Sequence, residues 1–285
     1  MNIDLTFVIQ GPIDIISVST IDAYLKYGKV IVSCWDNDSI TDEMLNMKGG
    51  HNVYREKYDL LEPYLNRITV IKSKYDEAIK DIHQPKFDHQ ILQAVSTLAG
   101  LERVDTEFAV KVRSDESYPD IDPILNKVKK FPDKIYTLNC NAFKDSYMKF
   151  NMGSHFLLSK TKYLKRAYQF RYVSEFFRPT LKVFGVNGDN RDKKSRGCIL
   201  STLGFLIALG EVPDWSNSAK QVKKHFDITA QRELKNFKWS QQSNRLKINK
   251  KCFQDRSQWK GGGFRGISYD RNFSNPTIAN HIDEV

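Results

Sequence analysis

The first half of the chain alternates short apolar runs with longer amphipathic stretches. Four short segments rich in apolar and β-branched residues are typical of buried strands: Leu5–Ile9, Lys29–Trp35, Arg67–Lys72 and Phe108–Arg113. Two longer stretches, Ser17–Tyr27 and His89–Val104, have apolar residues at helical spacing, and Gly28 follows the first of them. Strands that alternate with helices predict an α/β fold, with a mainly parallel, Rossmann-like sheet flanked by helices.

The second half is less regular. Strands are expected at Lys134–Leu138 and His155–Leu158, and helices at Thr161–Phe177 and Cys198–Leu209. Between the two helices lies a polar, glycine-containing loop, Gly185–Gly197. Loops of this length inside a compact domain usually have a function.

The net charge is concentrated near the C-terminus. Of the formal charge of +10, all is accounted for by residues 215–271, which hold 14 Lys and Arg against 4 Asp and Glu. We therefore divide the chain into a domain of the size expected for catalysis, residues 1–214, and a basic extension packed on it, residues 215–285. Such a segment suits contact with phosphate in nucleic acid, anionic lipid or a small molecule; the alternative is a solvated surface.

Several classes of protein are excluded by pattern. No run approaches the roughly 18 apolar residues of a membrane span, and the N-terminus lacks the basic and apolar regions of a signal peptide. The four cysteines are far apart, which argues against a disulfide scaffold or a zinc ribbon. We expect a soluble, cytoplasmic protein.

Polar residues follow three of the predicted strands. They are Gln10, Gly11 and Pro12 after the first strand, Asp36 and Asp38 after the second, and Asp115 and Glu116 after the one that ends at Arg113. Ligands of open α/β sheets bind beyond the carboxyl ends of the strands, so these side chains are candidates for a nucleotide site. Adjacent acids there suit a hard divalent cation, Mn²⁺ or Mg²⁺. The alternative for each acid is an ordinary helix cap or turn.

The strand Phe108–Arg113 carries charge in an apolar setting. Period-two alternation places Lys111, Arg113 and Asp115 on one face. Two cations on a buried face are costly unless they meet anions, and a diphosphate would supply them. Without ligand, Asp115 would pair with Arg113. The alternative is a structural network with nearby acids, namely Glu102, Asp105 or Glu107.

Familiar catalytic motifs are missing. The sequence has no G-x-G-x-x-G, no P-loop and no G-x-S-x-G, and its six histidines form no H-x-x-x-H pair. Classical dinucleotide binding, P-loop chemistry, a nucleophile elbow and a zinc hydrolase are therefore not expected.

Four motifs in order resemble the WavE-type lipopolysaccharide-synthesis proteins. They are Val8-Ile9-Gln10-Gly11-Pro12-Ile13, Val32-Ser33-Cys34-Trp35, Gln93-x-x-Ser96-Thr97-x-x-Gly100-Leu101 and Lys111-Val112-Arg113-Ser114-Asp115-Glu116. A weaker match covers Gly153-Ser154-His155-Phe156, where Ser154 takes the place of a usual aspartate.

The resemblance implies a glycosyltransferase of the GT-A type that uses a nucleoside diphosphate sugar, most simply a UDP-sugar. Its acceptor would be a glycan or a lipid-linked molecule in surface polysaccharide synthesis. The donor site would comprise Gln10, Gly11, Pro12, Asp36, Asp38, Lys111, Arg113 and Ser114. Asp115 would replace the Asp-x-Asp metal ligand, with Glu116 and His155 as further candidate ligands. Here the motif reads Arg-Ser-Asp-Glu, so cations beside it are an alternative to the metal.

An inverting transfer also needs a carboxylate base. Asp189 is our first candidate and Asp192 the second, with a solvated turn as the alternative. The competing functions are a nucleic-acid binder or nuclease that uses the basic, aromatic C-terminal segment, and a binding module without activity. Nucleic acid is the less favoured partner. Peripheral docking of residues 215–271 on the inner face of an anionic membrane is a further expectation.

Overall fold

The computed structural model describes residues 3–13, 15–42, 45, 55–75, 89–138, 150, 152–172, 201–214, 216–229, 233–234 and 238–239. Its strands are β1 (Leu5–Gln10), β2 (Lys29–Trp35), β3 (Thr69–Ser73), β4 (Phe108–Arg113), β5 (Glu116–Ser117), β6 (Ile135–Leu138), β7 (Leu157–Lys160), β8 (Phe226–Thr229) and β9 (Lys238–Trp239). Its helices are α1 (Ile15–Leu25), α4 (His89–Glu102), α5 (Asp122–Lys130), α6 (Thr161–Tyr172) and α9 (Ser218–His225), with short 3-10 helices η1 (Asn37–Ser39) and η2 (Tyr58–Tyr64). A further helix covers residues 201–208.

Seven strands form one sheet in the order β3-β2-β1-β4-β7-β6-β8. The neighbours β3, β2, β1 and β4 are parallel, and β8 is parallel to β6. Strand β7 runs antiparallel to both β4 and β6. The prediction of a mainly parallel α/β fold is therefore confirmed. The carboxyl ends of β1, β2 and β4 share one edge of the sheet, and the chain enters β7 from that same edge.

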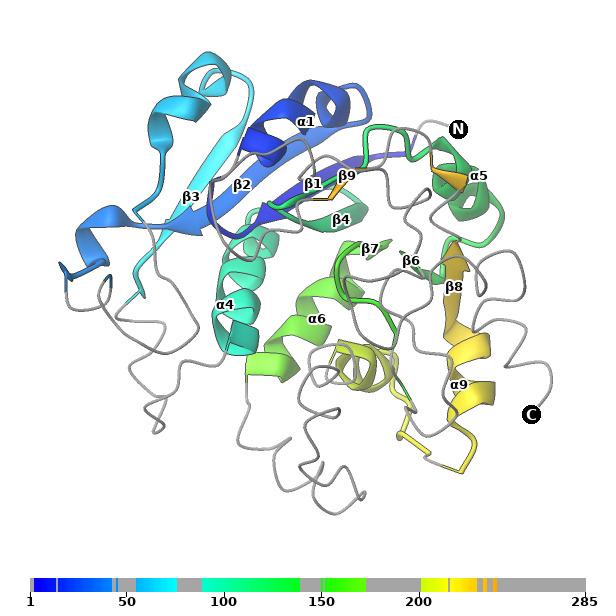
Figure 1. Cartoon of the computed structure of the whole chain (residues 1–285). Helices are drawn as coiled ribbons and strands as arrows, with labels where there is room; N and C mark the ends of the chain where they lie inside the picture. Colours follow the sequence, from blue (N-terminus) through cyan, green and yellow to red (C-terminus); the bar gives the residue numbers. More distant parts are fainter. Residues whose placement is uncertain are drawn as a thin grey trace, which may run out of the picture.

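Helices cover both faces of the sheet (Figure 1). Helices α1 and α5 pack on the face that carries Phe7, Val110 and Val112. Helices α4 and α6 and the helix over residues 201–208 pack on the other face, which carries Val8 and Ala109. The strands are apolar on both sides because both faces are covered, and β1 is buried along its whole length.

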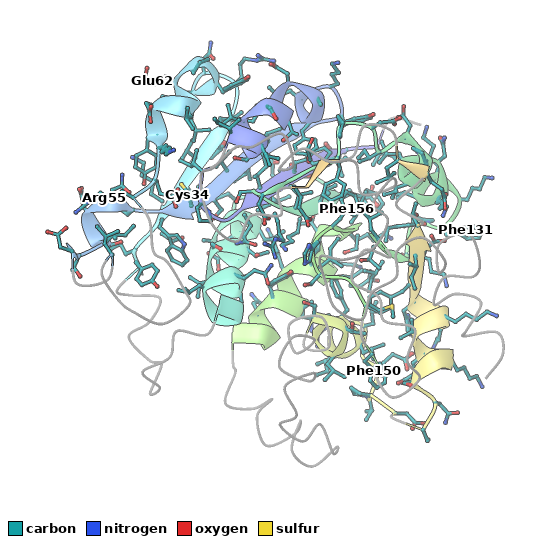
Figure 2. The ribbon with its side chains drawn as sticks, viewed as in Figure 1. Cys34, Arg55, Glu62, Phe131, Phe150 and Phe156 are labelled. Carbon is teal, nitrogen blue, oxygen red and sulfur yellow. The ribbon has the colours of Figure 1, made fainter. Side chains whose placement is uncertain are left out.

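Aromatic side chains fill the first of these layers. The rings of Phe7 and Tyr24 stack at 4.2 Å and fasten α1 to β1. Phe156, completely buried, meets the edge of Tyr118 at 5.1 Å and lies in the middle of the molecule (Figure 2). These contacts join β1, the segment after β4 and the entry to β7 in one core.

Helix α4 lies unusually close to the sheet at Gly100. A Cβ atom placed there would lie 2.5 Å from Cγ1 of Val8 and 3.1 Å from Cβ of Ser33. Ser33 in turn donates a hydrogen bond from Oγ to the carbonyl of Ser96, at 2.6 Å. Glycine at this position permits the close approach, so this part of the matched motif has a packing role.

The sheet continues past residue 214, where the basic extension was expected to begin. Strand β8 pairs with β6 in the main sheet, and β9 pairs with β5. Helix α9 leads into β8 and packs Val222 into the same core as α6. Among the helices that the structure describes, none has the length and apolar character needed to cross a membrane.

Candidate active site

The end of β1 presents a buried polar group without a partner. Gln10 is 9% exposed, and its Oε1 atom has no hydrogen-bond partner in the described part of the chain. The strand register sets it between Ser33 of β2 and Arg113 of β4. A buried amide oxygen left unpaired is costly, and a ligand at this edge would remove that cost.

The turns after β1 and β4 are interlocked. Gly11 has φ +120°, and its N–H donates to the carbonyl of Ser33 at 3.2 Å. The backbone N–H of Ser114 donates to the carbonyl of Gln10 at 2.9 Å. Ser114 is buried, whereas Pro12 is exposed beside the glycine. Three of the predicted donor-binding residues therefore lie together here, with Pro12 at the surface.

The acids after β2 act partly as caps. The carboxylate of Asp36 accepts from the N–H of Asp38 at 3.4 Å, at the start of η1. The N–H of Asp36 donates to the carbonyl of Ser73 at 2.8 Å, which ties the end of β2 to β3. Asp38 is exposed. Asp36 thus makes the helix cap that is the alternative to a ligand role, and the carboxylate of Asp38 lies in solvent.

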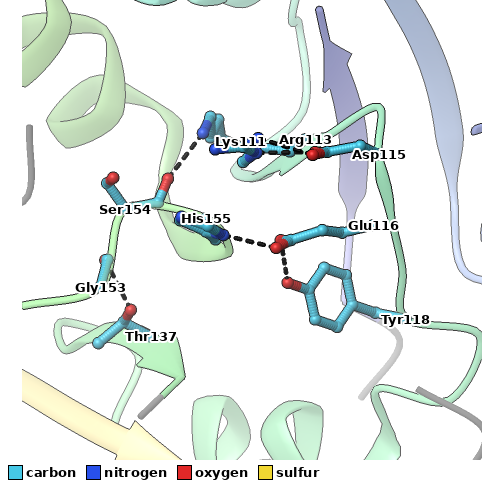
Figure 3. Close-up of polar contacts among 9 residues, drawn as sticks. All are labelled: Lys111, Arg113, Asp115, Glu116, Tyr118, Thr137, Gly153, Ser154 and His155. Carbon is cyan, nitrogen blue, oxygen red and sulfur yellow. Dashed lines mark hydrogen bonds and ion pairs between the residues drawn. The ribbon is translucent and has the colours of Figure 1, made fainter. Parts of the chain in front are cut away.

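Two cationic side chains of strand β4, Lys111 and Arg113, lie on the same face of the sheet. Lys111 is completely buried between Val8 of β1 and Leu157 of β7, and its Nζ donates to the carbonyl of Ser154 at 2.6 Å. Arg113 makes two parallel bonds to Asp115, Nε to Oδ1 and Nη2 to Oδ2, each 2.7 Å (Figure 3). The expected pairing of Arg113 with Asp115 is confirmed. The alternative network draws no support from Asp105, which pairs with Lys29.

Arg113 and Asp115 stay within reach of solvent. Their side chains are 35% and 25% exposed, respectively. Burial would lower the pKa of Arg113, but the charge and hydrogen bonds of Asp115, with a smaller contribution from Glu116, raise it above its usual value. The guanidinium is therefore a permanent cation that an incoming diphosphate can share or take from Asp115.

Behind this pair lies a buried carboxylate–imidazole contact. Glu116, whose side chain is fully buried, accepts from Nδ1 of His155 at 2.5 Å and from the hydroxyl of Tyr118 (Figure 3). His155 reaches this edge because β7 is antiparallel, so the segment before it lies beside the carboxyl end of β4. Tyr118 was not among the predicted site residues. Its position two residues after Glu116 is the one feature of the sequence that could have indicated it.

The segment before β7 is anchored on three sides. Lys111 binds the carbonyl of Ser154, and Oγ1 of Thr137 donates to the carbonyl of Gly153 at 2.8 Å. The N–H of Met152 donates to Oγ1 of Thr202 at 3.3 Å. The backbone that carries His155 is thus fixed by β4, β6 and the helix over residues 201–208, which makes the imidazole position part of the fold.

The predicted metal ligands are near one another but do not form a cluster. In the part of the chain that the structure describes, no group of three or more His, Cys, Asp or Glu side chains is arranged to hold a metal ion. Both oxygens of Glu116 are engaged by His155 and Tyr118, so this pair does not fit a metal as it stands. Both oxygens of Asp115, the third candidate, are likewise engaged, by Arg113.

The two candidate bases, Asp189 and Asp192, lie outside the described residues. A cavity of about 690 Å³ is found at the opposite, amino edge of the sheet, lined by residues that include Asp4, Gly28 and Arg67. None of the predicted site residues contributes to it. The chemistry gathered at the carboxyl edge, and not this cavity, defines the candidate active site.

Besides Tyr118, Glu56 at this edge was not predicted from the sequence. Glu56, which is 6% exposed, accepts from the N–H of Ile13 at 2.6 Å and from the N–H of Trp35 at 3.1 Å. Burial raises its pKa to about 7, against the lowering effect of these two hydrogen bonds. The local sequence around Glu56 has no pattern that could have shown a buried carboxylate.

Comparisons with known proteins found only distant structural similarity. No family model matches the chain. No curated protein matches it. Among solved structures, mouse xyloside xylosyltransferase 1 in its apo form is 10% identical, with a TM-score of 0.37 over 80% of this chain and 85% of that one.

Two further structures show the same level of resemblance. Residues 1–349 of S. aureus TarS, in complex with UDP, are 12% identical with a TM-score of 0.35, over 72% of this chain and 55% of that one. An active-site mutant of LgtC is 11% identical with a TM-score of 0.39, over 70% of each chain. Scores this low carry no functional inference, which must therefore come from the residues of this chain.

Proposed function

We propose that the chain is a glycosyltransferase of the GT-A type that takes a sugar from a nucleoside diphosphate sugar, a UDP-sugar in particular. The observation that carries the proposal is the unpaired Oε1 of Gln10, buried at the carboxyl edge beside Arg113. Gln10, Gly11 and Ser114 line this edge, with Asp36 and Asp38 at the next strand end. Two of the four WavE-type motifs include the turns after β1 and β4, and the other two lie within β2 and α4.

In the proposed site Arg113 is the group that receives the diphosphate. A bidentate contact with phosphate oxygens would replace its contact with Asp115, since arginine matches both anions in geometry. Transfer of the sugar leaves negative charge on the departing diphosphate, and a fixed guanidinium stabilises that charge. The ammonium of Lys111, held at the carbonyl of Ser154, adds positive potential on the same face of β4.

A divalent cation, Mn²⁺ or Mg²⁺, belongs to the proposal at one position. Asp115, once released by Arg113, would hold it together with diphosphate oxygens, and the cation would supply further neutralisation of the leaving group. The acceptor in the proposal is a glycan or a lipid-linked molecule, and the acceptor base is expected from Asp189 or Asp192. The exposed lysines of α9, Lys220, Lys223 and Lys224, are the described part of the surface proposed to meet an anionic membrane.

The test is a thermal-shift comparison of UDP, uridine and inorganic pyrophosphate with the full chain. A ligand at 100 times its Kd adds about 2.7 kcal/mol to the free energy of unfolding, which is a clear shift of the melting temperature. UDP is expected to stabilise the protein more than uridine does. Equal shifts from UDP and uridine would remove the diphosphate from the proposal.

Two variants locate the binding. Gln10→Met keeps the shape of the side chain and removes its amide, so the affinity for UDP should fall by roughly 3- to 10-fold, the worth of one neutral hydrogen bond. Lys29→Gln changes a surface ion pair at the other end of β2 and should leave affinity unchanged. An equal effect of the two variants would place the nucleotide elsewhere.

A further inference from the structure

A segment remote in sequence lies across the carboxyl ends of β1 and β2. Glu56 reaches from this segment to the backbone N–H of Ile13, in the turn after β1, and to the N–H of Trp35, the last residue of β2. Oε2 accepts from the N–H of Ile13, and Oε1 accepts from the N–H of Trp35. The turn that contains Gln10 and Gly11 and the strand end that precedes Asp36 are therefore tied to one side chain.

Glu56 is itself held firmly in place. The N–H of Glu56 donates to Oδ1 of Asn37 at 2.5 Å, and Nδ2 of Asn37 donates back to the carbonyl of Glu56 at 3.0 Å. The hydroxyl of Tyr58 donates to the carbonyl of Trp35. These contacts hold the backbone of Glu56 and its neighbours, so its carboxylate is a defined anchor for the turn after β1.

We propose that Glu56 is a positioning residue of the nucleotide site. Its carboxylate sets the turn after β1 against the end of β2, and nucleotide affinity therefore depends on pH near neutrality. This inference rests on the function proposed above. It adds a residue outside the matched motifs and a regulation of the same site. Glu56 touches the two backbone segments and acts on the nucleotide through them.

The charges around Glu56 leave it as the group that titrates. Burial raises its pKa to about 7. Burial, with the charge of Glu56, raises the pKa of the Cys34 thiol and of the Tyr58 hydroxyl above their usual values, so both stay neutral near pH 7. Among the described residues, the other charged groups of this region include Lys72, whose Nζ lies 3.9 Å from the Tyr58 ring, the Asp36 carboxylate, and Arg55, which pairs with Asp42. Cys34 and Arg55 lie at this end of the molecule in Figure 2.

Protonation changes what the carboxyl group can accept. The ionised form accepts from two N–H groups, one on each oxygen. In the protonated form one oxygen becomes a hydroxyl, a much weaker acceptor, so the hydrogen bond from the N–H of Ile13 or of Trp35 is weakened. The turn after β1 and the end of β2 are thus held together more firmly above the pKa of Glu56 than below it, and affinity for the nucleotide should rise with pH.

The experiment is calorimetric titration of UDP into the full chain at about pH 6 and about pH 8, with two variants. In Glu56→Gln one amide oxygen accepts one N–H, so the variant resembles the protonated wild type at every pH. At the higher pH the wild type should bind UDP about tenfold more tightly than Glu56→Gln, and at the lower pH the two should be within about twofold. The matched control is Glu62→Gln, an exposed glutamate on η2, which should behave as wild type (Figure 2).

Comparison within each pH removes the titration of UDP itself, since both proteins meet the same ligand. A ratio of wild-type to Glu56→Gln affinities that is the same at both pH values, while UDP binds, overturns this inference and leaves the proposed function standing. Absence of UDP binding by the wild type at both pH values overturns the proposed function and the inference with it.

A second measurement uses the wild type alone, in case Glu56→Gln does not fold. The amide signals of Ile13 and Trp35, followed by nuclear magnetic resonance from about pH 5 to about pH 9, should shift with one common midpoint near 7. Two unrelated midpoints, or a common midpoint near the 4.5 of an ordinary glutamate, overturn the inference.

Discussion

Gly11→Ala tests the turn that joins β1 to the candidate site. Gly11 has φ +120°, a backbone conformation that residues with a Cβ atom rarely adopt. A Cβ there would also lie 2.7 Å from Oγ and 3.6 Å from Cβ of Ser114. The substitution therefore introduces two separate costs, backbone strain and crowding against a buried side chain.

The expected loss follows from adding these costs. A residue forced into such a conformation costs about 1 to 3 kcal/mol. Crowding in a packed interior costs about 1 to 3 kcal/mol more. The free energy of unfolding should therefore fall by about 2 to 6 kcal/mol, and the melting temperature by roughly 5 to 15 °C.

Two controls separate strain from crowding. Gly210 has φ +78°, and a Cβ there would meet no atom within 4 Å, so Gly210→Ala reports strain alone, at about 1 to 2 kcal/mol. Ser114→Ala removes the hydroxyl that the new methyl group of Gly11→Ala would meet. In the double variant with Gly11→Ala, the crowding should be relieved and the strain should remain.

The assay is urea unfolding of the four variants and the wild type. We expect a favourable coupling of at least about 0.5 kcal/mol between Gly11→Ala and Ser114→Ala. If the effects of Gly11→Ala and Ser114→Ala on the free energy of unfolding are strictly additive, the Ser114 hydroxyl can rotate away at no cost. That result would refute the crowding between the new Cβ atom and Ser114. A loss no larger than that of Gly210→Ala would refute the role of Gly11 as the residue that permits the close contact of the two turns.

Three further predictions follow from the site. The pKa of Glu56 is raised from 4.5 to about 7, so the stabilisation by the protonated group is present below pH 4.5 and is lost as the pH rises through 7. Relative to Glu56→Gln, the wild type should therefore lose about 2 to 3 kcal/mol of unfolding free energy between about pH 5 and about pH 8 in urea unfolding, and a rise in stability would contradict the sign. Asp115→Asn should lower kcat of sugar transfer by at least about 100-fold with little change in melting temperature, because it keeps the shape and removes the charge at the edge; near-normal turnover would remove Asp115 from the site. Binding to anionic vesicles should weaken in a salt-dependent way, with turnover of a short soluble acceptor unchanged, when Gln replaces Lys220, Lys223, Lys224, Lys247, Lys250 and Lys251. If the wild type does not bind such vesicles at low salt, the docking hypothesis is wrong.

The alternation of apolar strands and amphipathic helices was enough to predict the layers of this protein. The strands Lys29–Trp35 and Phe108–Arg113 have the predicted bounds, because their β-branched, apolar residues fit only a strand covered on both faces. The pairing of Arg113 with Asp115 was also predictable, because the two residues are neighbours on one side of an extended chain. Such features depend on residues close together in the sequence.

The rest of the site was decided by the tertiary structure. The antiparallel direction of β7 brings His155 to Glu116, and the partner of Lys111 is a backbone carbonyl that no pattern marks. Glu56 becomes a buried acceptor for two turns in the same way. A buried charge or N–H must find a partner wherever the packed chain offers one, and that partner is set by strand order and helix packing over the whole molecule.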